Sequence, residues 1–261
     1  MLRVLMVGDI VGRPGRKAAR EYIKKYRKKY KLDLVIANGE NAAGGNGITE
    51  AVAGELYDAG IDIITMGNHT WDKREILDFI EHEPRLLRPA NYPPGTPGRG
   101  STIVRLGNNL HAGIINVAGR VFLPPLDCPF RTAEKLMEEI KTVTPVIIID
   151  FHAEATSEKV AFGWFMDGRV SAVVGTHTHI QTSDERILPR GTGYITDVGM
   201  TGPKDSVLGV NKELVIQKFT TLLPVRFEVA DGAAQFDALL LDIDEATGKT
   251  IKIERIKDFA E

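Results

Sequence analysis

Polar side chains that can bind metal ions follow several short apolar runs of this 261-residue chain. They are carboxylates, amides and imidazoles, and this donor set suits Mn, Fe or Zn better than Cu(I) or an iron–sulfur cluster. A carboxylate flanked by ligands from several strands can bridge two ions, and two ions ~3.5–4 Å apart can clamp a phosphate and generate hydroxide at neutral pH. The candidate ligands are Asp9, Glu40, Asn68, His152, His177 and His179.

Each candidate has an ordinary structural interpretation when it is taken alone. Asp9 could cap a helix, Asn68 could occupy a turn, and His152 could be a hydrogen-bonded core histidine. The pair His177 and His179 is more specific, because alternate residues of an extended segment point the same way. The set as a whole favours a metal site, since four of the six histidines follow apolar runs. The other two, His82 and His111, receive no role.

The apolar runs predict the elements that would position these side chains. Runs rich in Val and Ile occupy 4–7, 34–37, 61–66, 146–149 and 170–174, and helix-like segments follow at 14–29, 49–57, 73–81 and from 150 to about 165. Such alternation is typical of a mostly parallel sheet in a layered α/β fold. If the five strands are parallel neighbours, all the polar clusters meet at one edge of one sheet, where ligands bind in open α/β sheets.

The middle and the end of the chain have a different pattern. Proline and glycine at 89–97 and the Pro124-Pro125 pair predict loops. Segments 102–106 and 111–117 predict strands of a second sheet or a connecting hairpin, and 224–229, 236–243 and 250–256 predict antiparallel strands that close a sandwich of two sheets. We expect a single domain over residues 1–261, because this length suits one large domain.

Composition excludes several classes of protein. Apolar residues make up 43% of the chain and charged residues 26%, as in globular proteins, and the net charge of −2 gives no global basic field. A single cysteine, Cys128, rules out an internal disulfide, and no run resembles a membrane span or a signal peptide, so we expect a cytoplasmic protein. The basic stretch 24–31, interleaved with tyrosines, is either the solvated face of the first helix or an RNA-contacting patch.

The order of the motifs resembles the calcineurin-like metallophosphoesterase superfamily. That superfamily has Gly-Asp-x-His, Gly-Asp-x-x-Asp, Gly-Asn-His, a later lone His and Gly-His-x-His. This chain has Gly8-Asp9, Gly39-Glu40-Asn41, Gly67-Asn68-His69, His152 and Thr176-His177-Thr178-His179. It departs at Val11, where the superfamily has a metal-binding His, and at Glu40, where it has the bridging Asp. These departures, with the segments 8–15 and 39–44, resemble the YmdB-like branch of bacterial phosphodiesterases.

The resemblance implies a fold, a ligand set and a reaction. The fold would be a four-layer α-β-β-α sandwich with two mixed sheets flanked by helices. Asp9 and His179 would serve the first metal, Glu40 would bridge both, and Asn68, His152 and His177 would complete the second. Asn41 would replace the ligand that is missing at Val11. The two metals would be Fe or Mn, with Zn as an alternative, and His69 would be the general acid in opening a 2',3'-cyclic nucleotide to a 3'-nucleotide by attack of a metal-bridging hydroxide.

Three alternatives to this function stay open. A phosphomonoesterase or a phosphodiesterase that acts on RNA ends would use the same metal core, and a regulatory binding protein could use the metal site without catalysis.

The glycine-rich segment 43–47 could line the substrate site or form a flexible turn, and 199–203 could be an active-site loop. No substrate-binding residue can be assigned from the sequence, and the proline-rich loops and tyrosines could support a homo-oligomer.

Overall fold

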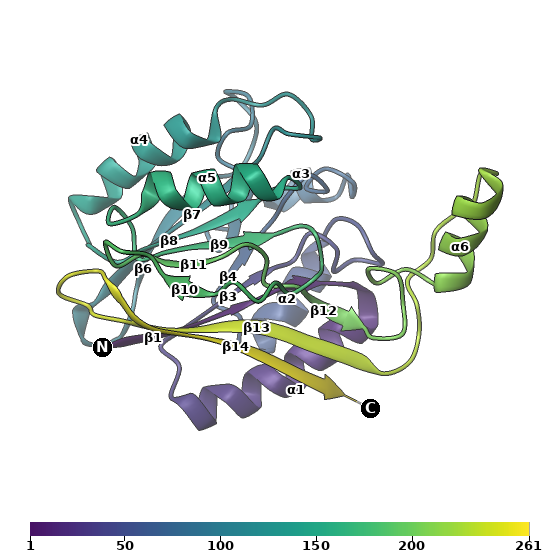
Figure 1. The fold of residues 1–261 in the computed structure, drawn as a ribbon, viewed down its shortest axis with the longest axis horizontal. Coiled ribbons are helices and arrows are strands. Elements are labelled where there is room, and N and C mark those ends of the chain that lie inside the picture. The colour runs from purple at the N-terminus through teal and green to yellow at the C-terminus, as the bar shows by residue number, and fades with distance from the viewer. Residues whose placement is uncertain (261) are drawn as a thin grey trace.

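The computed structural model describes residues 1–260, so Glu261, the last residue of the expected domain, lies outside the described residues. Its strands form two mixed sheets (Figure 1). The eight-stranded sheet has the order β2-β12-β13-β1-β3-β4-β5, with β14 paired to β13, and the six-stranded sheet has the order β10-β11-β9-β8-β7-β6. The strands of the larger sheet are β1 (Leu2–Val7), β2 (Asp9–Ile10), β3 (Leu34–Asn38), β4 (Ile63–Thr65), β5 (Leu86–Leu87), β12 (Met200–Pro203), β13 (Ala234–Ile243) and β14 (Thr250–Ala260). Those of the smaller sheet are β6 (Ser101–Arg105), β7 (His111–Ala118), β8 (Ile147–His152), β9 (Ala172–Thr176), β10 (Arg186–Ile187) and β11 (Gly193–Ile195).

The helices lie on the outer faces of the two sheets (Figure 1). Their bounds are α1 (Gly12–Tyr30), α2 (Glu50–Asp58), α3 (Ile76–Phe79), α4 (Pro129–Lys141), α5 (Thr156–Met166) and α6 (Lys212–Thr221), and a short 3₁₀ helix covers Gly107–Asn109. Helices α1 and α2 lie beside the eight-stranded sheet, and α4 and α5 beside the six-stranded sheet. Helix α6 instead projects from the body of the molecule. The predicted four-layer sandwich is therefore confirmed.

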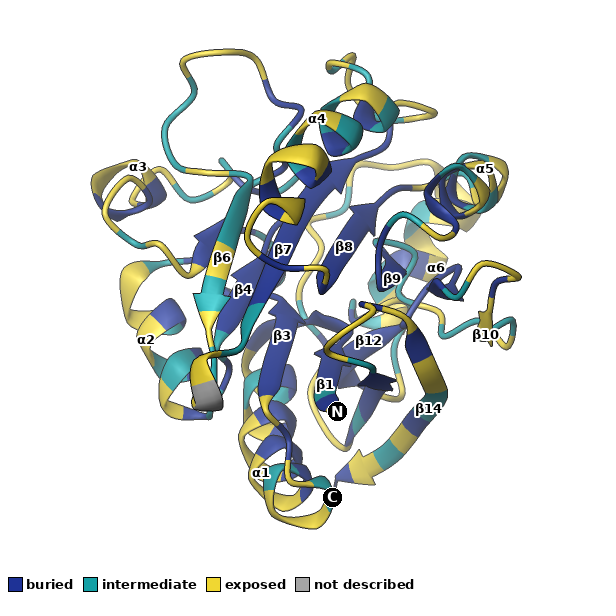
Figure 2. Ribbon diagram, turned by 90° about the vertical axis from the view of Figure 1, so that its left-hand side faces the viewer, coloured by how far each residue is buried: buried dark blue, intermediate teal, exposed yellow. Residues whose placement is uncertain are grey.

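Three separate apolar cores hold the layers together. Alternate residues of β1 show the division, because Val4 and Met6 face the core between the two sheets while Leu5 and Val7 face the core under α1 and α2. A third core packs α4 and α5 on the outer face of the six-stranded sheet. The central strands are accordingly buried along their length (Figure 2), and this explains why they are continuous apolar runs in the sequence.

The simplest arrangement placed the five predicted parallel strands in one sheet. In the structure they are divided between the two sheets. β1, β3 and β4 are parallel neighbours in the larger sheet, whereas β8 and β9 are parallel neighbours in the smaller one. An apolar run shows that a strand is buried on both faces but not which strand it pairs with. The polar clusters still meet, because the carboxyl ends of both groups of strands open to the same side of the sandwich.

Several predicted bounds were wrong for local reasons. The helix expected at 73–81 is reduced to Ile76–Phe79, since the preceding residues form turns, as in the bond from the Asp72 amide to the His69 carbonyl. The strand expected at 224–229 has no partner strand among residues 1–260, and only Val229 forms a bridge, with Val210. Helices α4 and α6 were not predicted. The segment 199–203, expected as a loop, supplies β12, which pairs with β2.

The basic stretch 24–31, which could be a solvated helix face or an RNA-contacting patch, lies at the end of α1 and in the residue that follows it. Tyr22 and Tyr26 are buried, and their rings stack near Phe236 of β13. Lys25 and Lys29 lie over tyrosine rings at the helix surface. The tyrosines therefore dock the helix on the sheet, and the cations form its outer face. No helix within residues 1–260 combines the length and the apolar character that crossing a bilayer requires.

Candidate metal centre

The centre of the site is the buried ring of His152, the last residue of β8. Its Nε2 lies 3.0 Å from Glu40 Oε1, 3.1 Å from Asn68 Oδ1 and 3.0 Å from His177 Nδ1. A ring nitrogen carries at most one proton, so it can donate to only one of these three atoms. Hydrogen bonding alone therefore does not explain why these four nitrogen and oxygen atoms converge. A cation between them would interact favourably with all four. Ligand atoms of Glu40, His152 and His177 all lie within 4.8 Å of one another.

A second group of donor atoms surrounds Asp9 of β2. His179 Nε2 lies 3.8 Å from Asp9 Oδ1 and 3.3 Å from Asn41 Oδ1. Asp9 is buried, and its Oδ1 has no hydrogen-bond partner among residues 1–260. An unpartnered carboxylate oxygen in the interior is costly unless a cation or a proton neutralises it. This group, which includes Asn41 Oδ1, therefore fits a second metal ion.

Close packing of glycine brings the two groups together. A Cβ on Gly67 would lie 2.2 Å from His152 Nε2 and 2.4 Å from Glu40 Oε2, so only glycine fits at this position. Gly8 similarly allows the Gly199 carbonyl to approach, and that carbonyl accepts a bond from the Asp9 amide. Gly67 and Gly8 thus permit close approach at the two groups of donor atoms.

The loop after β9 carries its two histidines in an unusual backbone conformation. His177 has φ 100° and His179 has φ 63°, values that non-glycine residues rarely adopt. The amide of His177 donates to Asp9 Oδ2 at 3.2 Å, and the amide of Thr178 donates to Asp197 Oδ2 at 3.0 Å. Because the segment is not extended, the two rings point to different groups, one to His152 and the other to Asn41. The expectation that they point the same way was wrong.

Burial and the ion pair between Glu40 and His152 are the main causes of the pKa shifts in this site. Burial lowers the pKa of His152, but the Glu40 carboxylate outweighs burial and raises it to about 9. Burial raises the pKa of Glu40, but His152 outweighs it and lowers the value to about 2. Burial and the neighbouring His152 lower the pKa of His177 to about 3. Burial raises the pKa of Asp9 to about 6, against the effect of His179.

A buried network behind His152 was not identified from the sequence. Its Nδ1 lies 2.9 Å from Thr176 Oγ1, and this hydroxyl donates to Asp150 Oδ1 at 2.7 Å. Asp150 also accepts a bond from Thr65. The strand pattern carried the signal, because Asp150 and His152 stand two residues apart and so face the same side of β8. Such partners orient metal-binding histidines.

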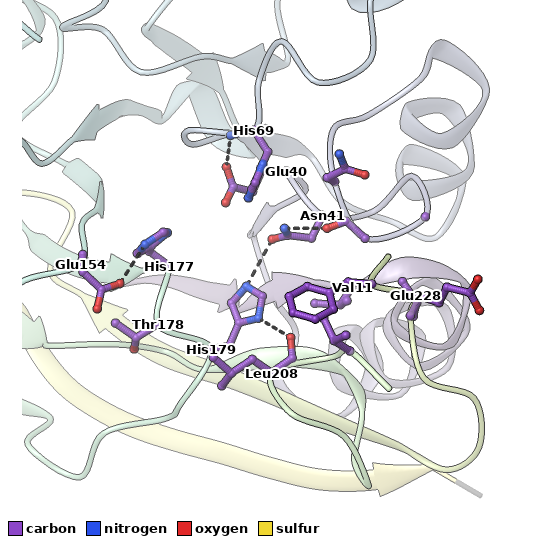
Figure 3. A pocket seen from close by; sticks show the side chains of 16 residues that line it. Val11, Glu40, Asn41, His69, Glu154, His177, Thr178, His179, Leu208 and Glu228 are labelled. Carbon is purple, nitrogen blue, oxygen red and sulfur yellow. Dashed lines mark hydrogen bonds and ion pairs between the residues drawn. The ribbon is translucent and has the colours of Figure 1, made fainter. Parts of the chain in front are cut away.

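The metal groups open into a pocket of about 500 Å³ (Figure 3). His69 lies on its wall, and its Nδ1 faces Asp72 Oδ2 at 2.8 Å. The glycine-rich segment also reaches the pocket, because Gly44, Gly45 and Asn46 line it, with the Asn41 side chain bonded to the Gly45 carbonyl. Neither Asp72 nor Glu154, which pairs with His177 Nε2 at 3.0 Å, was found from the sequence, since a surface acid gives no distinctive pattern.

Two sheets flanked by helices, with nitrogen and oxygen donors gathered at the carboxyl ends of the strands, define a protein of the metallophosphoesterase class. Residues 5–256 match the family described as YmdB-like protein, and the chain belongs to that family. A Bacillus subtilis (strain 168) protein named 2',3'-cyclic-nucleotide 2'-phosphodiesterase is 58% identical over 98% of this chain and 96% of its own length.

Two solved structures have the same fold over the whole of this chain. A hypothetical protein from Thermus thermophilus superimposes with a TM-score of 0.94 and 42% identity, and each chain is covered completely. A structure titled as a novel phosphatase from Mycoplasma pneumoniae gives a TM-score of 0.93 and 37% identity, over 100% of this chain and 94% of that one.

Proposed function

We propose that this protein is a metal-dependent phosphodiesterase that opens 2',3'-cyclic nucleotides to 3'-nucleotides. The observation that carries the proposal is the 58% identity, over almost the whole of both chains, to the Bacillus protein named for that activity. The convergence of nitrogen and oxygen donors on His152 and around Asp9 supports it independently, because a phosphodiesterase of this class needs two cations at one site.

The donor geometry supports a division of the ligands into two sets. Asp9, Asn41 and His179 would hold one ion, and Asn68, His152 and His177 would hold the other. Glu40 would bridge them, since its Oε1 faces His152 and it also lines the pocket together with Asn41 and His179. All the donors are nitrogen or oxygen atoms, which supports Fe or Mn as the metals and leaves Zn as the alternative.

A pair of metal ions bound at this site would clamp the phosphate and supply hydroxide at neutral pH. The remaining chemistry falls to His69. Asp72 holds Nδ1 at 2.8 Å, which leaves Nε2 as the ring atom available to the substrate. The P–O2' bond breaks as the new P–O bond forms, and the leaving 2' oxygen takes the Nε2 proton, which leaves the phosphate on the 3' oxygen.

The test is metal analysis combined with a substrate panel. Protein treated with chelator is reloaded with Mn²⁺, Fe²⁺ or Zn²⁺, and is then assayed on 2',3'-cyclic AMP, 3',5'-cyclic AMP, bis-nitrophenyl phosphate and a nitrophenyl monoester. We expect two metals per chain and preferential conversion of 2',3'-cyclic AMP to 3'-AMP, identified by chromatography. Chelated protein without added metal is the control, and it should be inactive.

A second candidate function is phosphomonoester hydrolysis. The Mycoplasma pneumoniae structure, which superimposes over this entire chain, is titled a phosphatase. Faster hydrolysis of the monoester than of every diester would favour this function and contradict our proposal. Two bound metals without hydrolysis of any ester would instead indicate a regulatory binding protein.

A further inference from the structure

A second pocket, of about 220 Å³, lies beside the metal centre. It is smaller than the ~300–1,000 Å³ typical of sites for drug-sized ligands, and so suits one flat ring system. Three loops build it: the one after β4, the one after β5 and the one after β7. The residues that line it are mostly apolar or aromatic, and include Asn68, Trp71, Tyr92, Pro93, Leu123 and Leu126. None of the lining side chains is charged, in contrast to the larger pocket with its three glutamates, Glu40, Glu154 and Glu228.

The aromatic wall of this pocket is fixed to the metal centre. The Tyr92 hydroxyl donates to the Gly67 carbonyl at 2.9 Å, one residue before the proposed metal ligand Asn68. Burial raises the pKa of Tyr92 to about 12, so this hydroxyl keeps its proton. The ring of Trp71 packs against Tyr92, with 5.9 Å between centroids and 48° between planes. Tyr92 is buried, whereas Trp71 is only partly buried and lines the pocket.

The reaction places part of the substrate on this side. In a 2',3'-cyclic nucleotide the leaving oxygen belongs to the same ribose that carries the base. The general acid must stand next to that oxygen, so the ribose lies on the His69 side of the phosphate. Asn68 and Trp71, which flank His69 in the sequence, both line the small pocket.

We propose that this pocket binds the nucleobase of the substrate and that Trp71 is its stacking platform. The inference rests on the proposed function and identifies the substrate class more closely, as nucleoside cyclic phosphates rather than simple cyclic phosphodiesters. An aromatic ring binds any base through its π-face, and it does so without selecting a sequence.

The pocket has little means of distinguishing one base from another. The amide and the carbonyl of Ala118 are both occupied by the side chain of Asn91, at 2.9 Å and 2.8 Å. Asn68 Oδ1 faces His152. With these polar groups engaged, binding depends on stacking, and all four 2',3'-cyclic nucleotides are accepted, purines more tightly because their ring systems are larger.

The larger pocket offers one competing aromatic side chain, Phe227. It comes from the segment after α6 and lines the pocket together with Leu208, whose carbonyl lies 3.0 Å from His179 Nδ1. Phe227 is thus associated with the His179 side of the metal centre. The ribose of the leaving group lies on the His69 side, and this favours Trp71.

Kinetics of four variants test the inference. Trp71→Ala should raise the KM for 2',3'-cyclic AMP about 10- to 100-fold with little change in kcat. Trp71→Phe should restore most of the affinity. The effect should be confined to substrates that have a base, so the methyl riboside 2',3'-cyclic phosphate, which has none, is assayed in parallel. Trp164→Ala, which removes the other tryptophan of the chain from the exposed face of α5, is the matched control. An increase in KM with Phe227→Ala but not with Trp71→Ala would overturn the inference.

A binding measurement separates this inference from the proposed function. The Trp164→Phe variant retains Trp71 as its one tryptophan, so its fluorescence reports on the small pocket. Titration with 3'-AMP should quench the signal, and inorganic phosphate alone should not. Quenching without hydrolysis of cyclic nucleotides would contradict the proposed function and retain the base site. Hydrolysis of 2',3'-cyclic AMP without quenching would contradict the base site and retain the function.

Discussion

At the residue scale, the proposed proton donor His69, paired with Asp72, is distinct from the proposed metal ligands. The ring lines the large pocket, but its nitrogen atoms are not among those that converge on His152 or Asp9. Only the backbone amide of His69 reaches the ligand set, where it donates to Glu40 Oε2 at 2.9 Å. Replacing the side chain therefore leaves that bond in place.

We predict that His69→Ala retains both metals and loses about 10²- to 10⁴-fold in turnover of 2',3'-cyclic AMP, the usual contribution of a positioned general acid. The loss should be much smaller with bis-nitrophenyl phosphate, because nitrophenolate leaves without a proton. Asp72→Asn should give an intermediate loss on the cyclic nucleotide. Metal analysis with kinetics on both substrates checks this, and equal losses on the two substrates would remove His69 from proton transfer.

The network behind His152 gives a prediction about metal affinity. Thr176→Val removes the hydroxyl that joins His152 Nδ1 to Asp150 at nearly constant volume. Loss of such an outer partner typically lowers metal affinity or activity ~10- to 100-fold. We expect weaker Mn²⁺ binding by calorimetry with a folded protein by circular dichroism. Thr132→Val on α4 is the control, and an unchanged affinity in Thr176→Val would show that Asp150 does not orient the ring.

The site residues that were predicted from the sequence lie at strand ends, whereas those that were missed lie in turns. Asp9, Glu40 and His152 stand at the carboxyl ends of apolar runs in the sequence, so their convergence follows from the direction in which the strands run. Asp72 and Glu154 reach the site only through the turns that follow, and no spacing rule marks them. The family resemblance implied the division of His177 and His179 between two groups, but their spacing did not, because the division depends on two residues with positive φ.

At the scale of elements, a buried ion pair joins α5 to the segment after β11, and this segment in turn holds the loop after β9. Lys159 Nζ donates to Asp197 Oδ2 and to the Thr176 carbonyl, each at 2.6 Å, and both side chains are inaccessible to solvent. Asp197 also accepts the amide of Thr178, between the two histidines. The position of the loop after β9, which carries His177 and His179, therefore depends on α5, a helix that contributes no proposed metal ligand.

We predict that Lys159→Met costs ~3–5 kcal/mol of unfolding free energy, because it leaves the Asp197 carboxylate buried without a cation. The double variant Lys159→Met/Asp197→Asn should regain part of this, since the uncompensated charge is gone. Urea denaturation measures both. Lys141→Met, which affects a surface pair 3.9 Å apart on α4, should cost less than ~0.5 kcal/mol. A similar small cost for Lys159→Met would contradict the role given to the pair.

Secondary structure was predicted well where an element is regular and buried, and poorly elsewhere. β1, β3 and β9 are apolar runs, and their type followed from the sequence, with limits that differ from the predicted runs 4–7, 34–37 and 170–174 by up to two residues. Their assignment to sheets did not, because the pairing of β1 with β13 joins residues more than 230 positions apart. The two-residue β2 exists through its pairing with the short β12, which also pairs with β13, and no local pattern specifies these pairings.

At the scale of the whole molecule, the proposed metals would connect the two sheets. Asp9, Glu40, Asn41 and Asn68 come from strands of the larger sheet or the loops that follow them, and His152, His177 and His179 come from the smaller one. Between the sheets lies an apolar core that ends at this edge. The ions would therefore add cohesion where apolar contact stops, and would neutralise the buried carboxylates of Asp9 and Glu40.

We predict that chelation lowers the Tm and that Mn²⁺ restores it. A ligand at 100 times its Kd stabilises the folded state by ~2.7 kcal/mol per site, which corresponds to roughly 5–10 °C for a domain of this size. If the ions join the sheets, removing a ligand from either side should abolish most of the gain, so Asn68→Ala and His179→Ala should behave alike in thermal scans with and without Mn²⁺. Glu228→Ala, a pocket residue outside both donor groups, is the comparison. A full Mn²⁺ response in Asn68→Ala, with none in His179→Ala, would mean that one sheet alone holds the metal.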